Sequence, residues 1–67
     1  RVRKQIGMKI GDRVVVSSRY LNEFNNMGGV ITSILDKQFH IEVSFDEEWS
    51  VDGDKVFPKK ELIKIKL

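Results

Sequence analysis

The chain of 67 residues contains no cysteine, a single proline and a single histidine. Without cysteine, it can form neither a disulfide nor a thiolate metal site, and it has no cysteine nucleophile. No apolar run approaches the roughly 20 residues that a membrane-spanning helix needs. No succession of basic, apolar and small-residue segments indicates a signal peptide. We therefore expect a cytoplasmic protein that does not bind membranes.

Charge is distributed unevenly along the chain. Lys and Arg number 12 against 10 Asp and Glu, which gives a net charge of +2. Because Arg1, Arg3 and Lys4 supply three of the positive charges, the remainder is slightly acidic. Met8 would make a natural first residue, so we interpret residues 1–7 as a flexible basic arm or a segment added for expression. Residues 8–67 then form one domain with a small core.

The sequence is organised around an alternating stretch in its centre. Four large apolar residues alternate there with three polar ones, in the order Phe39, His40, Ile41, Glu42, Val43, Ser44 and Phe45. Successive side chains of a strand point to opposite faces, so this period of two predicts a strand with one buried face. We predict that it is the central strand of a small antiparallel sheet, with its four apolar residues turned towards the core.

Shorter alternating patterns predict the remaining strands. They lie at residues 13–17, 30–35, 55–57 and 63–66. In the first of them, Val14 and Val16 are expected to face inward. Residues 59–62 have the composition of one helical turn before the last strand. The sequence therefore predicts an all-β domain of five short strands.

The connections carry their own signals. Residues 17–27 form a long loop, and Gly28-Gly29 predicts a positive φ or the close approach of another backbone. Residues 36–38 are the right length for a hairpin turn into the central strand. Asp52-Gly53 predicts a second hairpin, with residues 49–51 as its first arm, because such turns need a positive φ.

Three segments together resemble the SH3-like small β-barrel superfamily. They are Gly11-Asp12-x-Val14-x-Val16, Gly29-Val30-x-x-x-Ile34 and Phe57-Pro58-x-x-Glu61-Leu62. The first two are similar to the opening strands of KOW and Tudor barrels, and the third to the closing segment of SH3-type barrels. The spacing that leads to the third is also similar to that of the photosystem I accessory subunit and its electron-transfer relatives. The resemblance implies a single five-stranded SH3-like barrel with a long first loop and a 3₁₀ turn before the last strand.

Two features depart from particular branches of that superfamily. The loop at residues 17–27 has no internal glycine, whereas KOW barrels have a short glycine-containing loop there. No segment like the Ala-Leu-Tyr-Asp-Tyr of peptide-binding SH3 domains precedes Gly11-Asp12, so the resemblance does not imply binding of polyproline ligands. The matching motifs are structural, and they imply a fold rather than a function.

The sequence argues against catalysis and metal binding. His40 lies two residues from Glu42 and four from Ser44, but a solvent-facing strand offers no water-excluding pocket for a nucleophile. The carboxylates of residues 46–54 do not follow the twelve-residue pattern of a calcium loop. We therefore expect no enzymatic activity, no cofactor, no metal site and no small-molecule substrate.

We expect instead a non-catalytic binding module or small accessory subunit that docks on a protein or nucleoprotein complex. The predicted contact surface comprises Arg19, Tyr20, Asp46, Glu47, Glu48 and Trp49, in which an aromatic anchor lies among carboxylates. Trp49 is expected to be at least half-buried, because so small a chain has few residues with which to build a core. By the resemblance, the aromatic groove of this surface comprises Tyr20, Phe24, Trp49 and Phe57-Pro58. We expect Tyr20 to be exposed and Phe24 and Phe57 to pack in the core.

Two alternatives remain open. An RNA- or DNA-binding barrel of KOW or Tudor type would use the cations Arg1, Arg3, Lys4, Arg13, Arg19, Lys59 and Lys60. Lysines near the last strand are, however, more typical of an edge strand that resists association. An accessory subunit of an electron-transfer complex is the other alternative, and only the resemblance supports it.

Overall fold

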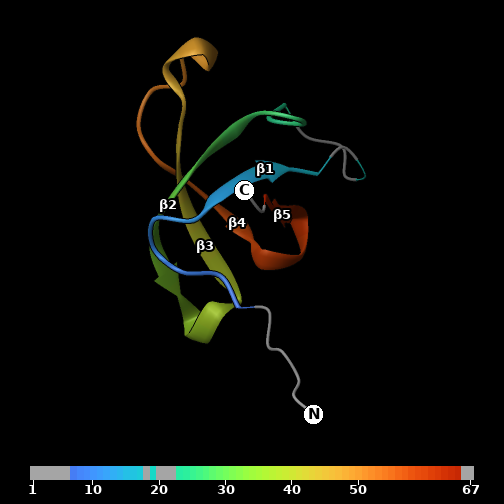
Figure 1. Cartoon of the computed structure of the whole chain (residues 1–67), viewed down its shortest axis with the longest axis vertical. Coiled ribbons are helices and arrows are strands. Elements are labelled where there is room, and N and C mark those ends of the chain that lie inside the picture. The colour runs from blue at the N-terminus through green and yellow to red at the C-terminus, as the bar shows by residue number, and fades with distance from the viewer. Residues whose placement is uncertain (1–6, 18, 20–22, 66–67) are drawn as a thin grey trace.

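The computed structural model describes residues 7–17, 19 and 23–65. Five strands and three 3₁₀ turns follow in the order β1 (Arg13–Val16), β2 (Gly28–Leu35), η1 (Asp36–Gln38), β3 (His40–Phe45), η2 (Glu47–Trp49), β4 (Lys55–Pro58), η3 (Lys59–Glu61) and β5 (Leu62–Lys64). The five strands form one antiparallel sheet in the order β4-β3-β2-β1-β5 (Figure 1). The all-β prediction, the five strands and the 3₁₀ turn before the last strand are confirmed.

The sheet is open within the described residues, because its edge strands β4 and β5 do not pair with each other. Strand β2 joins the two halves, since it pairs with β1 through its first residues and with β3 along its whole length. Thr32 is an extra residue on β2, where the register with β3 shifts between Ile31 and Ser33. This bulge leaves Ile31 and Ile34 on the inner face although they are three residues apart. Over the described residues as a whole, no helix is long and apolar enough to cross a membrane.

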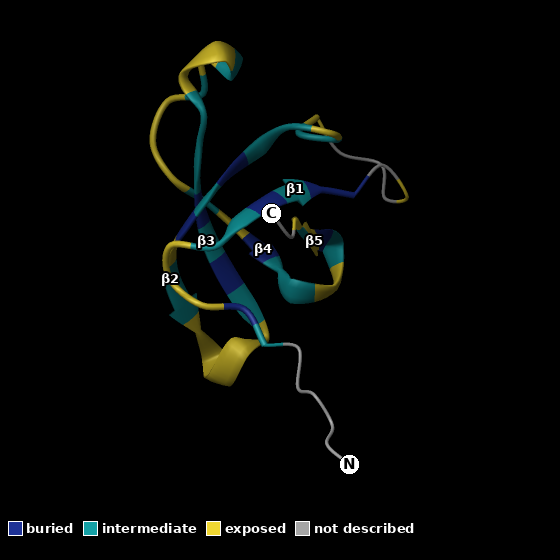
Figure 2. Cartoon of the chain, in the orientation of Figure 1, coloured by how far each residue is buried: buried dark blue, intermediate teal, exposed yellow. Residues whose placement is uncertain are grey.

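The core lies on the inner face of the curved sheet (Figure 2). Its buried members are Met8, Val14, Val16, Ile31, Ile41, Val43, Phe57 and Leu62. The inward positions predicted for Val14 and Val16 are therefore confirmed. In the central strand, Ile41 and Val43 are fully buried and Phe45 packs against the core.

Phe39 does not belong to the central strand, and its predicted place in the core was wrong. Strand β3 begins at His40, and Phe39 exposes 73% of its surface. The three residues before it, 36–38, all have positive φ, and Phe39 itself has helical backbone angles. The alternation of the strand therefore begins one residue later than the sequence pattern, and the ring of Phe39 faces solvent.

The predicted strand at residues 49–51 was also wrong. Turn η2 extends to Trp49, and the next residue, Ser50, has a left-handed φ of 52°. The strands β3 and β4 do form an antiparallel pair, but residues 46–54 connect them in place of a two-residue turn. Within that connection Gly53 has the predicted positive φ, 75°.

Gly29 lies where the backbones of three strands meet. It pairs with Val14 on one side and with Phe45 on the other. A Cβ atom at this position would overlap the carbonyl oxygen of Ser44 and lie 2.9 Å from the Cα atom of Phe45. The predicted close approach of another backbone is thus confirmed at Gly29, whereas neither it nor Gly28 has a positive φ.

We predict that Gly29→Ala lowers the free energy of unfolding by about 2–3 kcal/mol, because backbone atoms of β3 would have to move. Gly28→Ala is the matched control, since the atoms nearest to its added Cβ lie 3.6 Å away in ordinary contact. We expect it to change stability by less than about 1 kcal/mol. Urea unfolding followed by Trp49 fluorescence measures both variants, and equal stabilities would contradict the close approach.

Candidate functional site

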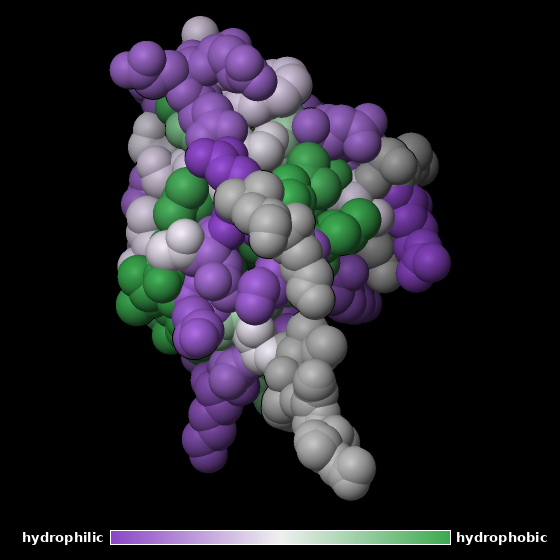
Figure 3. Space-filling model, viewed as in Figure 1, coloured by the Kyte–Doolittle hydropathy of each residue, from purple (hydrophilic) through white to green (hydrophobic). Residues whose placement is uncertain are grey.

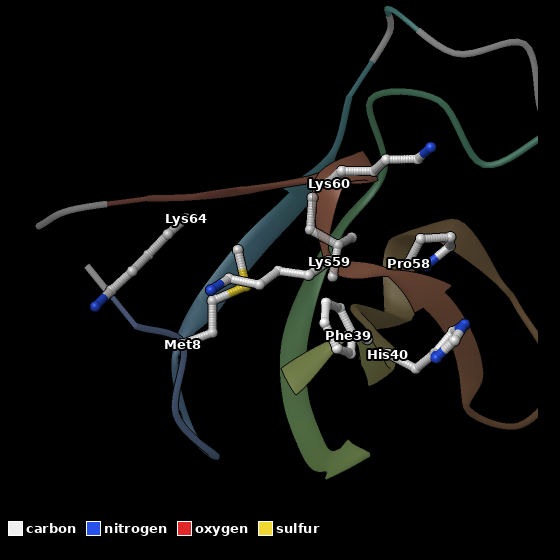
Figure 4. A pocket seen from close by; sticks show the side chains of 8 residues that line it. Met8, Phe39, His40, Pro58, Lys59, Lys60 and Lys64 are labelled. Atoms are coloured by element: carbon white, nitrogen blue, oxygen red, sulfur yellow. The ribbon is translucent and has the colours of Figure 1, made fainter. Parts of the chain in front are cut away.

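A groove with a volume of about 850 Å³ lies beside η3, the turn that joins the two edge strands (Figure 4). It is lined by Met8, Phe39, His40, Pro58, Lys59, Lys60, Leu62 and Lys64, which together we call the Phe39 groove. These residues come from the segment before β1, the start of β3, the end of β4, η3 and β5. A site of this kind can be assembled only by the folded chain.

The floor of the Phe39 groove is apolar. Met8 and Leu62 belong to the core, and Pro58 is half-buried. Phe39 is the most exposed of the large hydrophobic residues that the structure describes. Apolar side chains gathered in a concave, solvent-open site are typical of ligand and partner binding.

The exposed ring of Phe39 is attached to a backbone that is held from two sides. The N–H of Phe39 donates to the carbonyl oxygen of Asp36 at 3.0 Å. The carbonyl of Phe39 accepts from the N–H of Lys59 at 2.9 Å, which ties the start of β3 to η3. The backbone that carries the ring is therefore held by main-chain hydrogen bonds.

Cationic side chains surround the apolar floor. Figure 4 shows Lys59 extended across the groove towards Met8, with Lys60 and Lys64 to its two sides. Neither Lys59 nor Lys60 forms an ion pair with a described residue. Two ammonium groups are therefore available there to a bound anion.

The third lysine, Lys64, is held by Asp12. Its Nζ atom lies 3.3 Å from Asp12 Oδ2 and donates to the carbonyl of Gly7 at 3.4 Å. Asp12 Oδ2 also accepts from the N–H of Lys9 at 2.8 Å. This hydrogen bond from Lys9, together with the Lys64 ammonium, outweighs partial desolvation and lowers the pKa of Asp12 below its ordinary 3.8. Asp12 thus links the turn before β1 to β5.

We predict that Asp12→Asn destabilises the chain at neutral pH and that the loss disappears in acid. Because its folded pKa is lowered, the carboxylate contributes stability above its unfolded pKa of 3.8. That contribution is lost as the pH falls through the lower folded pKa. Urea unfolding of the variant and the parent at successive pH values measures the difference, which should shrink below pH 3.8.

Asp52→Asn is the control for this prediction, because Asp52 is exposed and has no ion pair among the described residues. We expect it to match the parent at neutral pH. A loss of stability in Asp12→Asn that stayed constant down to pH 2 would show that the charge of Asp12 is not the cause.

The histidine of the central strand contacts a different carboxylate from the one considered in the sequence. His40 Nδ1 lies 2.7 Å from Asp36 Oδ2. Glu42 instead accepts a hydrogen bond from Thr32 Oγ1 at 3.0 Å. Over the described residues, no group of three His, Cys, Asp or Glu side chains could hold a metal ion.

The predicted contact surface is only partly described. Tyr20 lies outside the described residues, as do the basic residues Arg1, Arg3 and Lys4. Arg19, Glu47 and Glu48 are exposed. Trp49 is half-buried, as predicted, and its Nε1 atom is shielded from solvent without a hydrogen-bond partner in the described part of the chain.

Asp46 and Arg13, which the sequence assigns to different candidate surfaces, pair with each other. Arg13 Nη1 donates to Asp46 Oδ2 at 2.8 Å. The hydrogen bond and charge of Asp46 raise the pKa of Arg13. The pair joins β1 to the end of β3, so each residue has a partner within the fold.

The predicted aromatic groove is divided between the interior and another surface. Phe24 stacks on Phe45 with ring centroids 5.4 Å apart, and Phe57 meets these rings edge-on at 5.6 and 5.8 Å. Phe57 is buried and Phe24 packs against the core, as predicted. Of the described members, only Pro58 lines the Phe39 groove.

The acidic segment, residues 46–48, and the Phe39 groove lie at opposite ends of β3 (Figure 1). Hydrophilic residues gather at the η2 end in Figure 3, where Glu47 and Glu48 are exposed. The sequence does not reveal the groove, because alternation places Phe39 in the core and no local pattern links Met8 to η3. Two parts of the groove have a signal in the sequence: Lys59-Lys60, assigned to the nucleic-acid alternative, and Pro58, assigned to the aromatic groove.

Comparisons with models of protein families, with curated proteins and with solved structures find no match to this chain.

Proposed function

We propose that this chain is a non-catalytic binding module that docks on a protein or nucleoprotein complex through the Phe39 groove. The observation that carries the proposal is an aromatic ring exposed to 73% on a backbone fixed at both its N–H and its carbonyl. Rigid aromatic anchors with charged neighbours are typical of binding hot spots. Lys59 and Lys60 are the charged neighbours here.

We propose further that the sheet curls into an SH3-like barrel. In a flat sheet, the four strand spacings between β4 and β5 would separate them by about 19 Å. The step from Pro58 to Leu62, however, spans at most about 14 Å when fully extended, and η3 shortens it. Strong curling of the sheet is therefore required, and the place of η3 between the last two strands supports the same fold.

Nucleic-acid binding is a second candidate, favoured by two lysines that have no ion pair with a described residue and lie beside an exposed ring. Single-stranded nucleic acids bind to cationic grooves that carry aromatic stacking surfaces. Such binding weakens steeply with salt because counterions are released. The predicted acidic contact surface around Trp49 and the electron-transfer alternative both stay predictions.

We predict that Phe39→Ser reduces partner capture from a lysate of the source organism at least about tenfold, because it removes the hot-spot anchor. Ile10→Ser is the matched control and should leave capture unchanged. Both substitutions remove an exposed hydrophobic side chain, with 73% and 66% exposure respectively, but only Phe39 lines the groove. Quantitative mass spectrometry of the captured proteins measures the effect, and thermal unfolding checks that both variants fold.

Two further samples separate the competing surfaces. If capture persists in Phe39→Ser but falls in the double variant Glu47→Gln/Glu48→Gln, the acidic segment is the contact surface and the groove proposal is wrong. If nuclease treatment abolishes capture by the parent chain, the partner is held through nucleic acid.

A further inference from the structure

We infer that the Phe39 groove takes a short acidic peptide segment anchored by one large apolar side chain, an inference that rests on the proposed function. The groove offers an apolar floor and two lysines that form no ion pair with a described residue. An apolar residue flanked by Asp or Glu satisfies both features at once.

The apolar floor of the groove determines which kind of side chain can anchor the peptide. Met8, Pro58 and Leu62 present aliphatic surface, and none of their side chains donates or accepts a strong hydrogen bond. A leucine- or phenylalanine-sized side chain loses apolar surface to water when it enters such a floor. A nucleobase would gain less from the same floor, because its polar edges cannot form strong hydrogen bonds with these three side chains.

The charged residues that line the groove determine the sign of the charge that a ligand must carry. Lys59, Lys60, Lys64 and His40 line the groove, and none of the residues that line it is acidic. Asp12 lies against Lys64 and Asp36 against His40, and Glu61 of η3 does not line the groove. Among the described residues, Lys59 and Lys60 form no ion pair, so their positive charge is available in the groove.

The rest of the molecule limits how long the anionic partner can be. The whole chain has a net charge of +2, but four of its twelve Lys and Arg lie outside the described residues, which hold eight Lys or Arg and ten Asp or Glu. The exposed carboxylates of Glu47 and Glu48 lie at the far end of β3. A polyanion that extended from the groove along β3 would be repelled by these carboxylates, whereas a short acidic peptide would stay beside the lysines.

The test is a set of titrations of the full ¹⁵N-labelled chain followed by amide chemical shifts at physiological salt. The first probe is a nine-residue peptide with one leucine between two pairs of glutamates. The second has glutamine in place of every glutamate, and the third has serine in place of the leucine. The fourth is a nine-nucleotide oligothymidine.

We expect the acidic peptide to shift the amides of the Phe39 groove and to bind at least about threefold more tightly than its glutamine and serine counterparts. The double variant Lys59→Gln/Lys60→Gln should weaken the acidic peptide about three- to tenfold but leave the glutamine peptide unchanged. Lys37→Gln/Lys55→Gln is the matched control, because these two lysines do not line the groove. Phe39→Ser should weaken every peptide that carries leucine.

Three results would overturn the inference. They are equal binding of the acidic and glutamine peptides, absence of shifts in the groove with the acidic peptide, and tighter, Phe39-dependent binding of oligothymidine. In each of these cases the proposed function is judged separately, by whether partner capture depends on Phe39. Oligothymidine binding that disappears in Arg1→Gln/Arg3→Gln/Lys4→Gln, with peptide binding unchanged, would support the inference, because the groove itself would then still select the peptide.

Discussion

The architecture depends on one close backbone contact, the approach of β3 to β2 at Gly29. Because this position has no Cβ atom, the backbone of β3 at Ser44 and Phe45 can lie against it, while β2 also pairs with β1 there. Each neighbour then carries an edge strand, β5 beside β1 and β4 beside β3. Since three residues of η3 suffice to join these edges, the two halves must fold towards each other. The Phe39 groove lies at that junction, beside η3.

The ion pairs determine which charges remain available at the surface. Arg13 is neutralised by Asp46, and Lys64 lies against Asp12. Partly exposed pairs of this kind add little to stability, commonly below about 1 kcal/mol. Their larger consequence concerns which charges stay unpaired, because Lys59 and Lys60 of η3 take part in no ion pair with a described residue. The groove therefore carries positive charge, whereas the acidic segment at the other end of β3 carries negative charge.

The sequence predicts the features that depend on local periodicity and misses those that depend on turn conformation. Val14, Val16, Ile41 and Val43 are buried as their alternation indicates, because a strand with one wet face must repeat every two residues. Phe39 continues that alternation in the sequence, but the structure interrupts it, because the three residues before Phe39 have positive φ. These residues are Asp, Lys and Gln, so no glycine in the sequence indicates their positive φ. The groove is harder still to predict, because it joins Met8 to residues fifty positions later.

The exposure of Phe39 has an energetic meaning in a chain with so small a core. Burial of a phenylalanine side chain is worth roughly 1.5–3 kcal/mol, which is a large fraction of the stability that a small domain has available. Folding does not obtain this free energy, because the ring of Phe39 stays exposed. Two hydrogen bonds nevertheless hold the backbone of Phe39. Because its backbone is already held, Phe39 loses little main-chain entropy when a partner covers the ring, so the burial that folding leaves unused can contribute to binding. The same argument explains why the anchor lies at a strand terminus beside η3, where the backbone is rigid and the side chain is free of the core.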